Sequence, residues 1–227
     1  MTQSNPESFP RPLPATAVTL PVAIVALAGA IVLGLIARGP NVLGWDVDIT
    51  VAVQRMDGRV SDAAADIANV LGSTWFAAPA ISVALVIAAV KRAWPTLLFL
   101  TSLLVLRLAG TQVKPIFDSP RPTEDLVRII GTWEGTGYPS GHAMSSSTLA
   151  LGLAVIAWQW IPSRTLARIV IGVLVAYTLL VGWARIWTGA HWASDVIGGY
   201  LFGIAIVALS VLVVERFPRN SRTPAAT

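Results

Sequence analysis

The sequence predicts an all-α, polytopic membrane protein, and three observations support this prediction. Hydrophobic residues make up 55% of the 227 residues and charged residues only 12%, whereas soluble domains carry about one-quarter charged residues. The apolar residues form long runs, and a membrane-spanning helix needs about 20 mostly apolar residues. Tryptophans lie near the ends of several of these runs, as side chains at a membrane–water interface often do.

Six segments are predicted to span the membrane, and together they form one integral-membrane domain over residues 1–227. The segments are 16–37, 75–90, 94–113, 143–160, 166–184 and 196–214. The first resembles a cleaved signal peptide in position, but its apolar run is long and no small-x-small site follows it, so we expect it to be retained. In the sixth, Gly199 and Gly203 form a small-xxx-small pair that favours close helix packing. The tails, 1–14 and 218–227, are predicted to be mobile.

The segment 41–72 is less apolar and has an amphipathic pattern. Its apolar side chains fall on one helical face, namely Trp45, Ile49, Ala52, Val53 and Met56. This pattern predicts an external helix that lies on the membrane interface. An ordinary helix within a loop is the alternative.

Three polar clusters, 114–122, 139–142 and 184–195, each adjoin an apolar run, and the loop charges indicate which side they occupy. With a cytoplasmic N-terminus and six spans, the cytoplasmic basic residues are Arg11, Lys91, Arg92, Arg164, Arg168, Arg216, Arg219 and Arg222. The only acidic residues on that side are Glu7 and Glu215. Positive residues favour the cytoplasm, so both termini are predicted to be cytoplasmic and all three clusters to face the other side.

The chain has two histidines, and each lies in one of these clusters. His191 precedes Asp195 by four residues, a spacing that puts both side chains on one face of a helix. A carboxylate that accepts from one ring nitrogen fixes the tautomer and leaves the other nitrogen free to attack. Attack on phosphorus would form a covalent phosphohistidine. The alternative is a structural His–Asp pair.

His142 ends the sequence Pro139-Ser140-Gly141-His142 at the start of the fourth predicted span. The first amides of a helix have no partners within the helix and form an anion site. Glycine lets the backbone approach such a ligand closely, and a histidine there can protonate a leaving group. The alternative is that these residues only begin the helix. Ser145, Ser146 and Ser147 are either bonded to His142 or packed in the bundle.

Three cations, Lys114, Arg121 and Arg185, lie near predicted membrane boundaries. Each alone is typical of a snorkelling or orienting side chain, but together they supply the positive charge that a transferring phosphoryl group requires. Arg107, two turns before Lys114, is expected to bond carbonyls or an acid inside the bundle, or else to extend this cationic surface. The basic residues are otherwise scattered, so no nucleic-acid partner is expected. The absence of cysteine excludes a thiolate metal site.

The three clusters together resemble the signature of the type 2 phosphatidic acid phosphatase superfamily, in its membrane lipid phosphatase branch. The first family motif is Lys, six residues, Arg-Pro, which is matched by Lys114, Arg121 and Pro122. The second is Pro-Ser-Gly-His, which residues 139–142 match in full.

The third family motif is Ser-Arg, five residues, His, three residues, Asp. Arg185, His191 and Asp195 match it, and Ala184 replaces the serine, which puts only a supporting hydrogen bond in doubt. The resemblance implies that His191 is the nucleophile, that Asp195 orients it and that His142 is the general acid. It also implies that no metal ion or cofactor is needed, and that the phosphate is bound by Lys114, Arg121, Arg185 and the amides of Ser140 and Gly141.

A site at the bilayer surface suits a lipid phosphate whose phosphate group lies at headgroup depth. The short stretch between the first two motifs leaves little room for a cap over a large headgroup, which favours a polyprenyl diphosphate such as undecaprenyl diphosphate. Phosphatidylglycerophosphate and phosphatidate are alternative substrates. The alternatives of another class are a non-catalytic binder or carrier of anionic lipids, and vanadate-dependent oxidation. The oligomeric state is not predicted.

Overall fold

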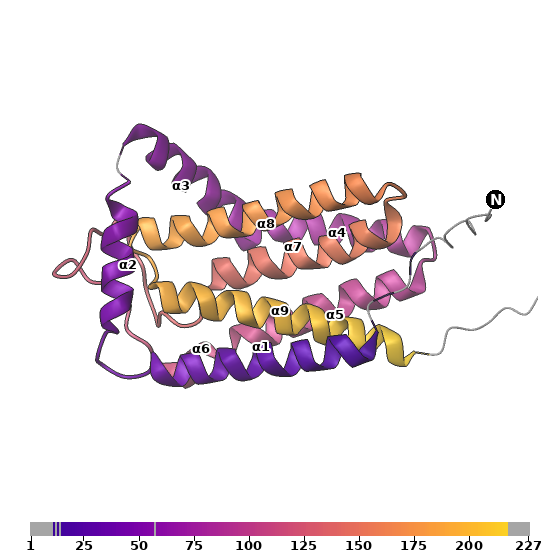
Figure 1. The fold of residues 1–227 in the computed structure, drawn as a ribbon, viewed down its shortest axis with the longest axis horizontal. Coiled ribbons are helices and arrows are strands. Elements are labelled where there is room, and N and C mark those ends of the chain that lie inside the picture. The colour runs from indigo at the N-terminus through magenta and orange to yellow at the C-terminus, as the bar shows by residue number, and fades with distance from the viewer. Residues whose placement is uncertain (1–10, 12, 14, 57, 218–227) are drawn as a thin grey trace, which may run out of the picture.

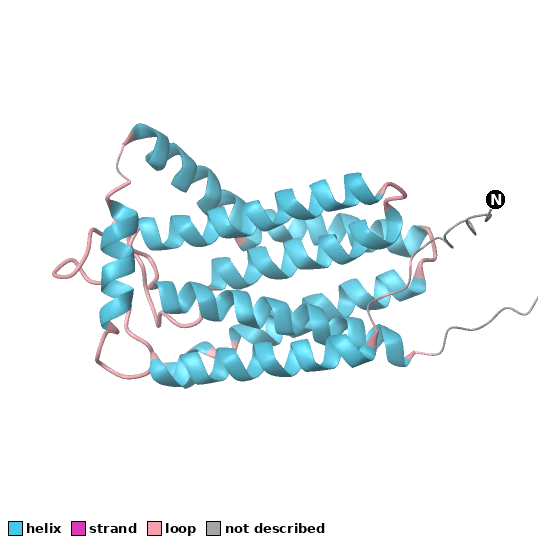
Figure 2. Cartoon of the chain, in the orientation of Figure 1, coloured by secondary structure: helices cyan, strands magenta, loops and turns pink. Residues whose placement is uncertain are grey.

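The structure is a computed structural model that describes residues 11, 13, 15–56 and 58–217. Within these residues the regular secondary structure is entirely helical (Figure 2). Long helices lie side by side along one axis, and α2, Gly44–Gln54, crosses one end of the bundle (Figure 1). The predicted all-α fold is therefore confirmed. The mobility predicted for the tails falls outside the described residues, apart from Arg11 and Leu13.

Six helices follow the predicted apolar segments closely. They are α1 (Thr16–Ile36), α4 (Thr74–Val90), α5 (Trp94–Thr111), α7 (Gly141–Trp160), α8 (Arg164–Trp187) and α9 (Ala193–Arg216). A short helix, α6 (Lys114–Phe117), continues α5. By length and hydropathy, four described helical segments can cross a membrane, namely α1, α5 with α6, α8 and α9. A fifth candidate is the broken span formed by α3 (Arg59–Gly72) and α4, and the prediction of six spans remains a prediction.

Helix α7 differs from a lipid-facing span because its first half is polar and buried. Ser146, Ser147 and Thr148 are each at most 2% exposed. The Ser147 hydroxyl donates to the carbonyl of Ala143 at 2.7 Å, one turn earlier on the helix. Because α7 packs against both α8 and α9, these polar residues face protein rather than hydrocarbon.

Helices α7 and α9 run in the same direction in close contact, and glycines of α9 make this approach feasible. A Cβ on Gly199 would lie 2.7 Å from the carbonyl oxygen of Ser140 and 2.8 Å from the Cβ of Ala143. Gly203 packs in the same way against Ser147. The close packing predicted from the small-xxx-small pair is confirmed, and it brings the N-termini of both helices to one end of the bundle.

The segment 41–72 forms two helices rather than the single external helix that was predicted. Much of the predicted apolar face is exposed, since Trp45 and Ile49 of α2 are each 38% exposed and Met56, just beyond its end, is 57% exposed. Helix α3 instead packs against α8, where Ala65 and Ala68 contact a cluster with Ala184 and Trp187. The division has a physical reason: Gly58, the N-cap of α3, has φ +134°, a backbone conformation that glycine favours and that interrupts a continuous helix.

The inner side of α2 carries Asp46, which caps α9. The Asp46 carboxylate is 1% exposed and accepts from the Ser194 amide at 2.8 Å and the Ser194 hydroxyl at 2.6 Å. The first amides of a helix need an acceptor, and negative charge is favoured there by the helix dipole. Burial raises the pKa of Asp46, and the hydrogen bonds from Ser194 oppose this shift. Asp46 therefore ties the crossing helix to the start of α9.

We expect Asp46→Ala to destabilise the protein by about 1–3 kcal/mol, because the amide and hydroxyl of Ser194 would remain buried without an acceptor. Asp48→Ala, at an exposed position of the same helix, is the matched control and should leave the melting temperature nearly unchanged. Thermal unfolding of the detergent-solubilised protein, followed by circular dichroism, measures both variants. Equal melting temperatures for Asp46→Ala and the control would contradict the capping role.

Candidate active site

The three polar clusters meet at the end of the bundle where α7 and α9 begin and α8 ends (Figure 1). The Ser140 amide of the second cluster donates to the Asp195 carbonyl of the third at 2.9 Å. Arg121 of the first cluster donates to the Ala190 carbonyl of the third at 2.7 Å. Segments whose contacting residues are 55 and 69 positions apart along the chain therefore form one site.

A tight turn after α8 brings His191 back to Arg185. Gly189 has φ +65°, in the left-handed region that glycine favours. The amide of Gly189 donates to the Ile186 carbonyl and that of Ala190 to the Arg185 carbonyl, each at 3.0 Å. This pair of bonds is the Schellman arrangement that ends many helices. The spacing from Arg185 to His191 in the third motif is thus the length of one such turn.

Asp195 orients His191 and caps α9 with the same carboxylate oxygen. Its Oδ2 lies 3.1 Å from His191 Nδ1 and 3.1 Å from the Trp192 amide nitrogen. The Asp195 side chain is fully buried and that of His191 is 3% exposed. A proton on Nδ1 is fixed by this contact, so Nε2 carries the lone pair. Nε2 faces Arg121, whose NH1 lies 3.5 Å away.

The surroundings of His191 favour its neutral form. Burial lowers the pKa of His191 well below its ordinary value of 6.5. The positive charges of Arg121, Arg185, Lys114 and His142 lower the pKa further, in that order of effect. The imidazole therefore stays neutral at neutral pH, with its proton on Nδ1 and a lone pair on Nε2. His142 and the three predicted cations are thus all close enough to His191 to affect its pKa.

Backbone carbonyls hold two of these cations without neutralising them. Lys114 Nζ donates to the Thr136 carbonyl at 3.1 Å, and Arg121 Nε donates to the Gly135 carbonyl at 2.9 Å. Each cation keeps further N–H groups for a ligand. A pocket of about 500 Å³ opens beside Arg121, and Gly135 and Thr136 contribute to its lining. This pocket borders the site at Arg121.

At the start of α7, one of the two amides predicted to bind phosphate is available and the other is not. Ser140 caps the helix, since its hydroxyl accepts from the Ala143 amide at 3.4 Å. The amide of Gly141, in the first turn, has no acceptor one turn earlier in the helix. The Ser140 amide donates to the Asp195 carbonyl, so the prediction that this amide binds phosphate is wrong. Its role is to join α7 to α9.

Arg107 has the structural role that was expected. Its guanidinium donates to the Gly141 carbonyl at 3.2 Å and to the Ser145 hydroxyl at 2.6 Å, both on α7. Ser145 therefore bonds Arg107 rather than His142. These contacts fix the start of α7 against α5.

Three residues of the site neighbourhood were missed from the sequence: Asp46, Asn69 and Gly137. A Cβ on Gly137 would lie 2.8 Å from Asp195 Oδ2 and 3.1 Å from the Pro120 carbonyl oxygen, so only glycine leaves the carboxylate in place. In the sequence, only the position of Gly137, two residues before the second motif, could have indicated that it lies near the site. Asn69 accepts from Arg185 NH1 through its side chain at 2.8 Å, and nothing in the sequence pattern of α3 marks it.

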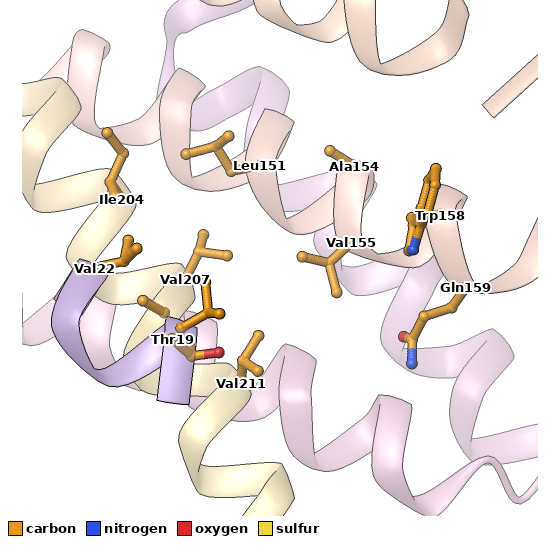
Figure 3. Close-up of a pocket in the computed structure, with 12 residues that line it drawn as sticks. Thr19, Val22, Leu151, Ala154, Val155, Trp158, Gln159, Ile204, Val207 and Val211 are labelled. Carbon is orange, nitrogen blue, oxygen red and sulfur yellow. The ribbon is translucent and has the colours of Figure 1, made fainter. Parts of the chain in front are cut away.

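A second pocket, of about 380 Å³, is lined by residues that include Val22, Leu151 and Val207 (Figure 3). Its walls come from α1, α7 and α9 and are apolar apart from residues such as Thr19 and Gln159. None of the predicted site residues lines it. It is therefore separate from the candidate active site.

A family model described as the PAP2 superfamily matches residues 95–219, which include all three motifs. The chain belongs to the PAP2 superfamily. The resemblance seen in the motifs is thereby confirmed. The matched region begins in α5, so α1 to α4 lie outside it.

Several PAP2 relatives are similar over part of their length. An undecaprenyl-diphosphatase from Sulfolobus acidocaldarius is 39% identical over 83 residues, which cover 36% of this chain and 35% of that protein. Phosphatidylglycerophosphatase B from Bacillus subtilis is 26% identical over 123 residues, which cover 52% of this chain and 58% of that protein. The chain thus aligns with less than two-thirds of either relative.

A solved structure confirms the fold of this PAP2 protein. The crystal structure of a transmembrane PAP2-type phosphatidylglycerolphosphate phosphatase from Bacillus subtilis superposes with a TM-score of 0.75 at 20% sequence identity. The superposition covers 87% of this chain and 98% of that one. It therefore includes helices on both sides of the boundary where the family model begins.

We expect ¹⁵N-histidine NMR in detergent micelles to show that the His191 ring stays neutral well below pH 6.5. With only two histidines in the chain, a His142→Asn variant assigns both signals. Arg121→Gln removes the charge with the largest effect on His191, so the His191 pKa should rise. Lys91→Gln, at the other end of the bundle, is the control. The same pKa near 6.5 in wild type and Arg121→Gln would contradict this account.

Proposed function

We propose that the protein is a membrane phosphatase that removes phosphate from a lipid phosphate or diphosphate through a phosphohistidine intermediate. The observation that carries the proposal is the buried His191–Asp195 pair, whose free Nε2 faces Arg121. A binder of anionic lipids needs the cations but not an oriented, neutral imidazole. The names of the two PAP2 relatives, a diphosphatase and a phosphatidylglycerophosphatase, support the same activity.

In the first step, Nε2 of His191 attacks phosphorus and the bond from phosphorus to the leaving oxygen breaks. Lys114, Arg121, Arg185 and the Gly141 amide bind the phosphoryl oxygens and offset their negative charge. His142 donates a proton to the leaving oxygen. Asp195 accepts from the Nδ1 proton of the phosphohistidine and so stabilises the positive ring.

In the second step, water attacks phosphorus and the bond between phosphorus and Nε2 breaks. His142, now unprotonated, accepts the proton from the attacking water, so that the two steps together return both histidines to their starting forms. Inorganic phosphate leaves the site. The reaction consumes one water and yields the dephosphorylated lipid.

We propose that no metal ion takes part. Hard metal ions bind to clustered carboxylate oxygens, whereas the residues around His191 Nε2 are cationic. Within the described ranges, no group of three or more His, Asp or Glu side chains is arranged to hold a metal ion.

We propose a polyprenyl diphosphate as the substrate, with glycerolipid phosphates as the second candidate. The short stretch between the first two motifs and the similarity to an undecaprenyl-diphosphatase support the former. The similarity to phosphatidylglycerophosphatase B supports the latter. We propose that the site faces the non-cytoplasmic side, with both termini in the cytoplasm. The positive residues at the opposite end, among them Arg11, Lys91 and Arg164, favour this orientation.

We expect His191→Ala to lose more than about a thousandfold in kcat/KM, because no other group replaces the nucleophile. Phosphate release from undecaprenyl diphosphate, phosphatidylglycerophosphate and phosphatidate in detergent measures this loss, and the wild-type specificity constants rank the substrates. Acid quenching with ³²P-labelled substrate should leave label on the wild type and none on His191→Ala. Wild-type turnover by a correctly folded His191→Ala would refute the assignment.

We expect chelators to leave phosphate release unchanged, because fixed cations supply the charge stabilisation. The measurement is turnover of the purified protein after dialysis against EDTA, with and without added magnesium. Loss of activity with EDTA that magnesium restores would show that the site works through a metal.

A further inference from the structure

The break between α3 and α4 lies beside the active site and leaves backbone carbonyls in need of partners. The two helices meet at an angle of 44°. The last carbonyls of a helix have no partners within it, and at membrane depth they must be satisfied by protein. The Ser73 hydroxyl donates to the Val70 carbonyl at 2.7 Å, and the Tyr177 hydroxyl of α8 donates to the Leu71 carbonyl at 2.8 Å.

The preceding carbonyl, that of Asn69, lies within hydrogen-bonding reach of the His142 ring. Gly72 makes this approach feasible, since a Cβ there would lie 3.2 Å from His142 Cδ2 and 2.5 Å from a methyl carbon of Val181. When one ring nitrogen donates to a carbonyl, the orientation of the imidazole is fixed, and so is the direction in which the other nitrogen points. The end of α3 therefore lies where its carbonyl can orient the His142 ring.

The side chain of the same residue fixes Arg185. Asn69 Oδ1 accepts from Arg185 NH1 at 2.8 Å. The ring of Trp133 covers the guanidinium, 4.3 Å from Cζ to the ring centroid, as in a cation–π contact. Arg185 Nε has no hydrogen-bond partner in the part of the chain that the structure describes. A guanidinium fixed in this way presents its remaining donors in one direction.

Small side chains bring α3 close enough for both contacts. Ala65 and Ala68 are fully buried against α8, in a cluster with Ala184. Ala184 occupies the position where the third family motif has serine. The replacement thus lies at the α3–α8 contact, one residue before Arg185.

We propose that Asn69 is a positioning residue that aims the phosphate-binding Arg185 through its side chain and the general acid His142 through its backbone carbonyl. This inference rests on the proposed phosphatase function. Asn69 lies outside the three motifs and outside the region that the family model matches. It acts through other residues and does not itself take part in the reaction.

The side-chain role is tested with Asn69→Ala, which removes Oδ1 and keeps the backbone carbonyl. A hydrogen bond to a charged group contributes about 1.5–3 kcal/mol, so we expect the inhibition constant of inorganic vanadate to rise about tenfold or more. kcat/KM should fall by a similar factor for dodecyl phosphate and for p-nitrophenyl phosphate. Asp66→Ala, at an exposed position of the same helix, is the control. Asn69→Ser repeats the test if the alanine variant does not fold.

The backbone role is tested with Gly72→Ala, whose new methyl group would displace the end of α3 from His142 and Val181. Dodecyl phosphate has a poor leaving group that needs a proton, whereas p-nitrophenolate leaves without one. We expect the ratio of kcat for dodecyl phosphate to kcat for p-nitrophenyl phosphate to fall about tenfold, because general acid catalysis contributes 10²–10⁴-fold. Gly172→Ala is the control, since a Cβ there meets no atom within 4 Å.

The outcomes separate this inference from the proposed function. Vanadate inhibition and kcat/KM within twofold of wild type in Asn69→Ala would overturn the side-chain role. Equal losses on both substrates in Gly72→Ala would overturn the backbone role, because a general loss of structure lowers both alike. If the wild type releases no phosphate, or His191→Ala remains active, the phosphatase proposal fails. Vanadate binding to wild type and Asn69→Ala, measured by thermal shift, then still decides the side-chain role.

Discussion

The active site depends on the close parallel packing of α7 against α9. Gly199 and Gly203 let the two backbones meet, and the Ser140 amide is bonded to the Asp195 carbonyl at the point of contact. Two helix N-termini consequently lie side by side, and the dipoles of both place partial positive charge at the same point. A larger side chain at either glycine would separate the start of α7 from the start of α9. The anion site and the oriented His191 would then no longer face one another.

Cations can be concentrated at this point because each is held by neutral groups. Lys114 and Arg121 are bonded to backbone carbonyls, and Arg185 is bonded to the Asn69 amide and covered by Trp133. Neutral partners fix the direction of each cationic side chain without neutralising its charge. The site is therefore positively charged before a ligand enters. The same positive charge, with burial, keeps His191 neutral. One electrostatic environment therefore both attracts a phosphate and preserves the nucleophile that would attack it.

The sequence was sufficient to predict the three clusters, because polar groups next to long apolar runs are conspicuous and their spacing follows local rules. His191 lies just before the N-cap of α9 and Asp195 lies in its first turn, and the step from Arg185 to His191 is one Schellman turn. Contacts between distant segments left no such pattern. The Ser140 amide was misassigned because its acceptor, the Asp195 carbonyl, comes from another helix. Asp46 was missed because its partner, Ser194, comes from another helix far along the chain.

Two of the three residues that were missed, Asp46 and Asn69, lie in α2 and α3, which precede the region matched by the family model. Asp46 holds the start of α9, and Asn69 holds Arg185 and lies against His142. The motifs thus supply the proposed reacting groups, while α2 and α3 hold the segments that carry those groups. Productive geometry has to be held within a fraction of an ångström, and a helix break is an effective support because its free carbonyls accept hydrogen bonds. It follows that substitutions in α2 and α3 can change turnover while every motif residue stays the same.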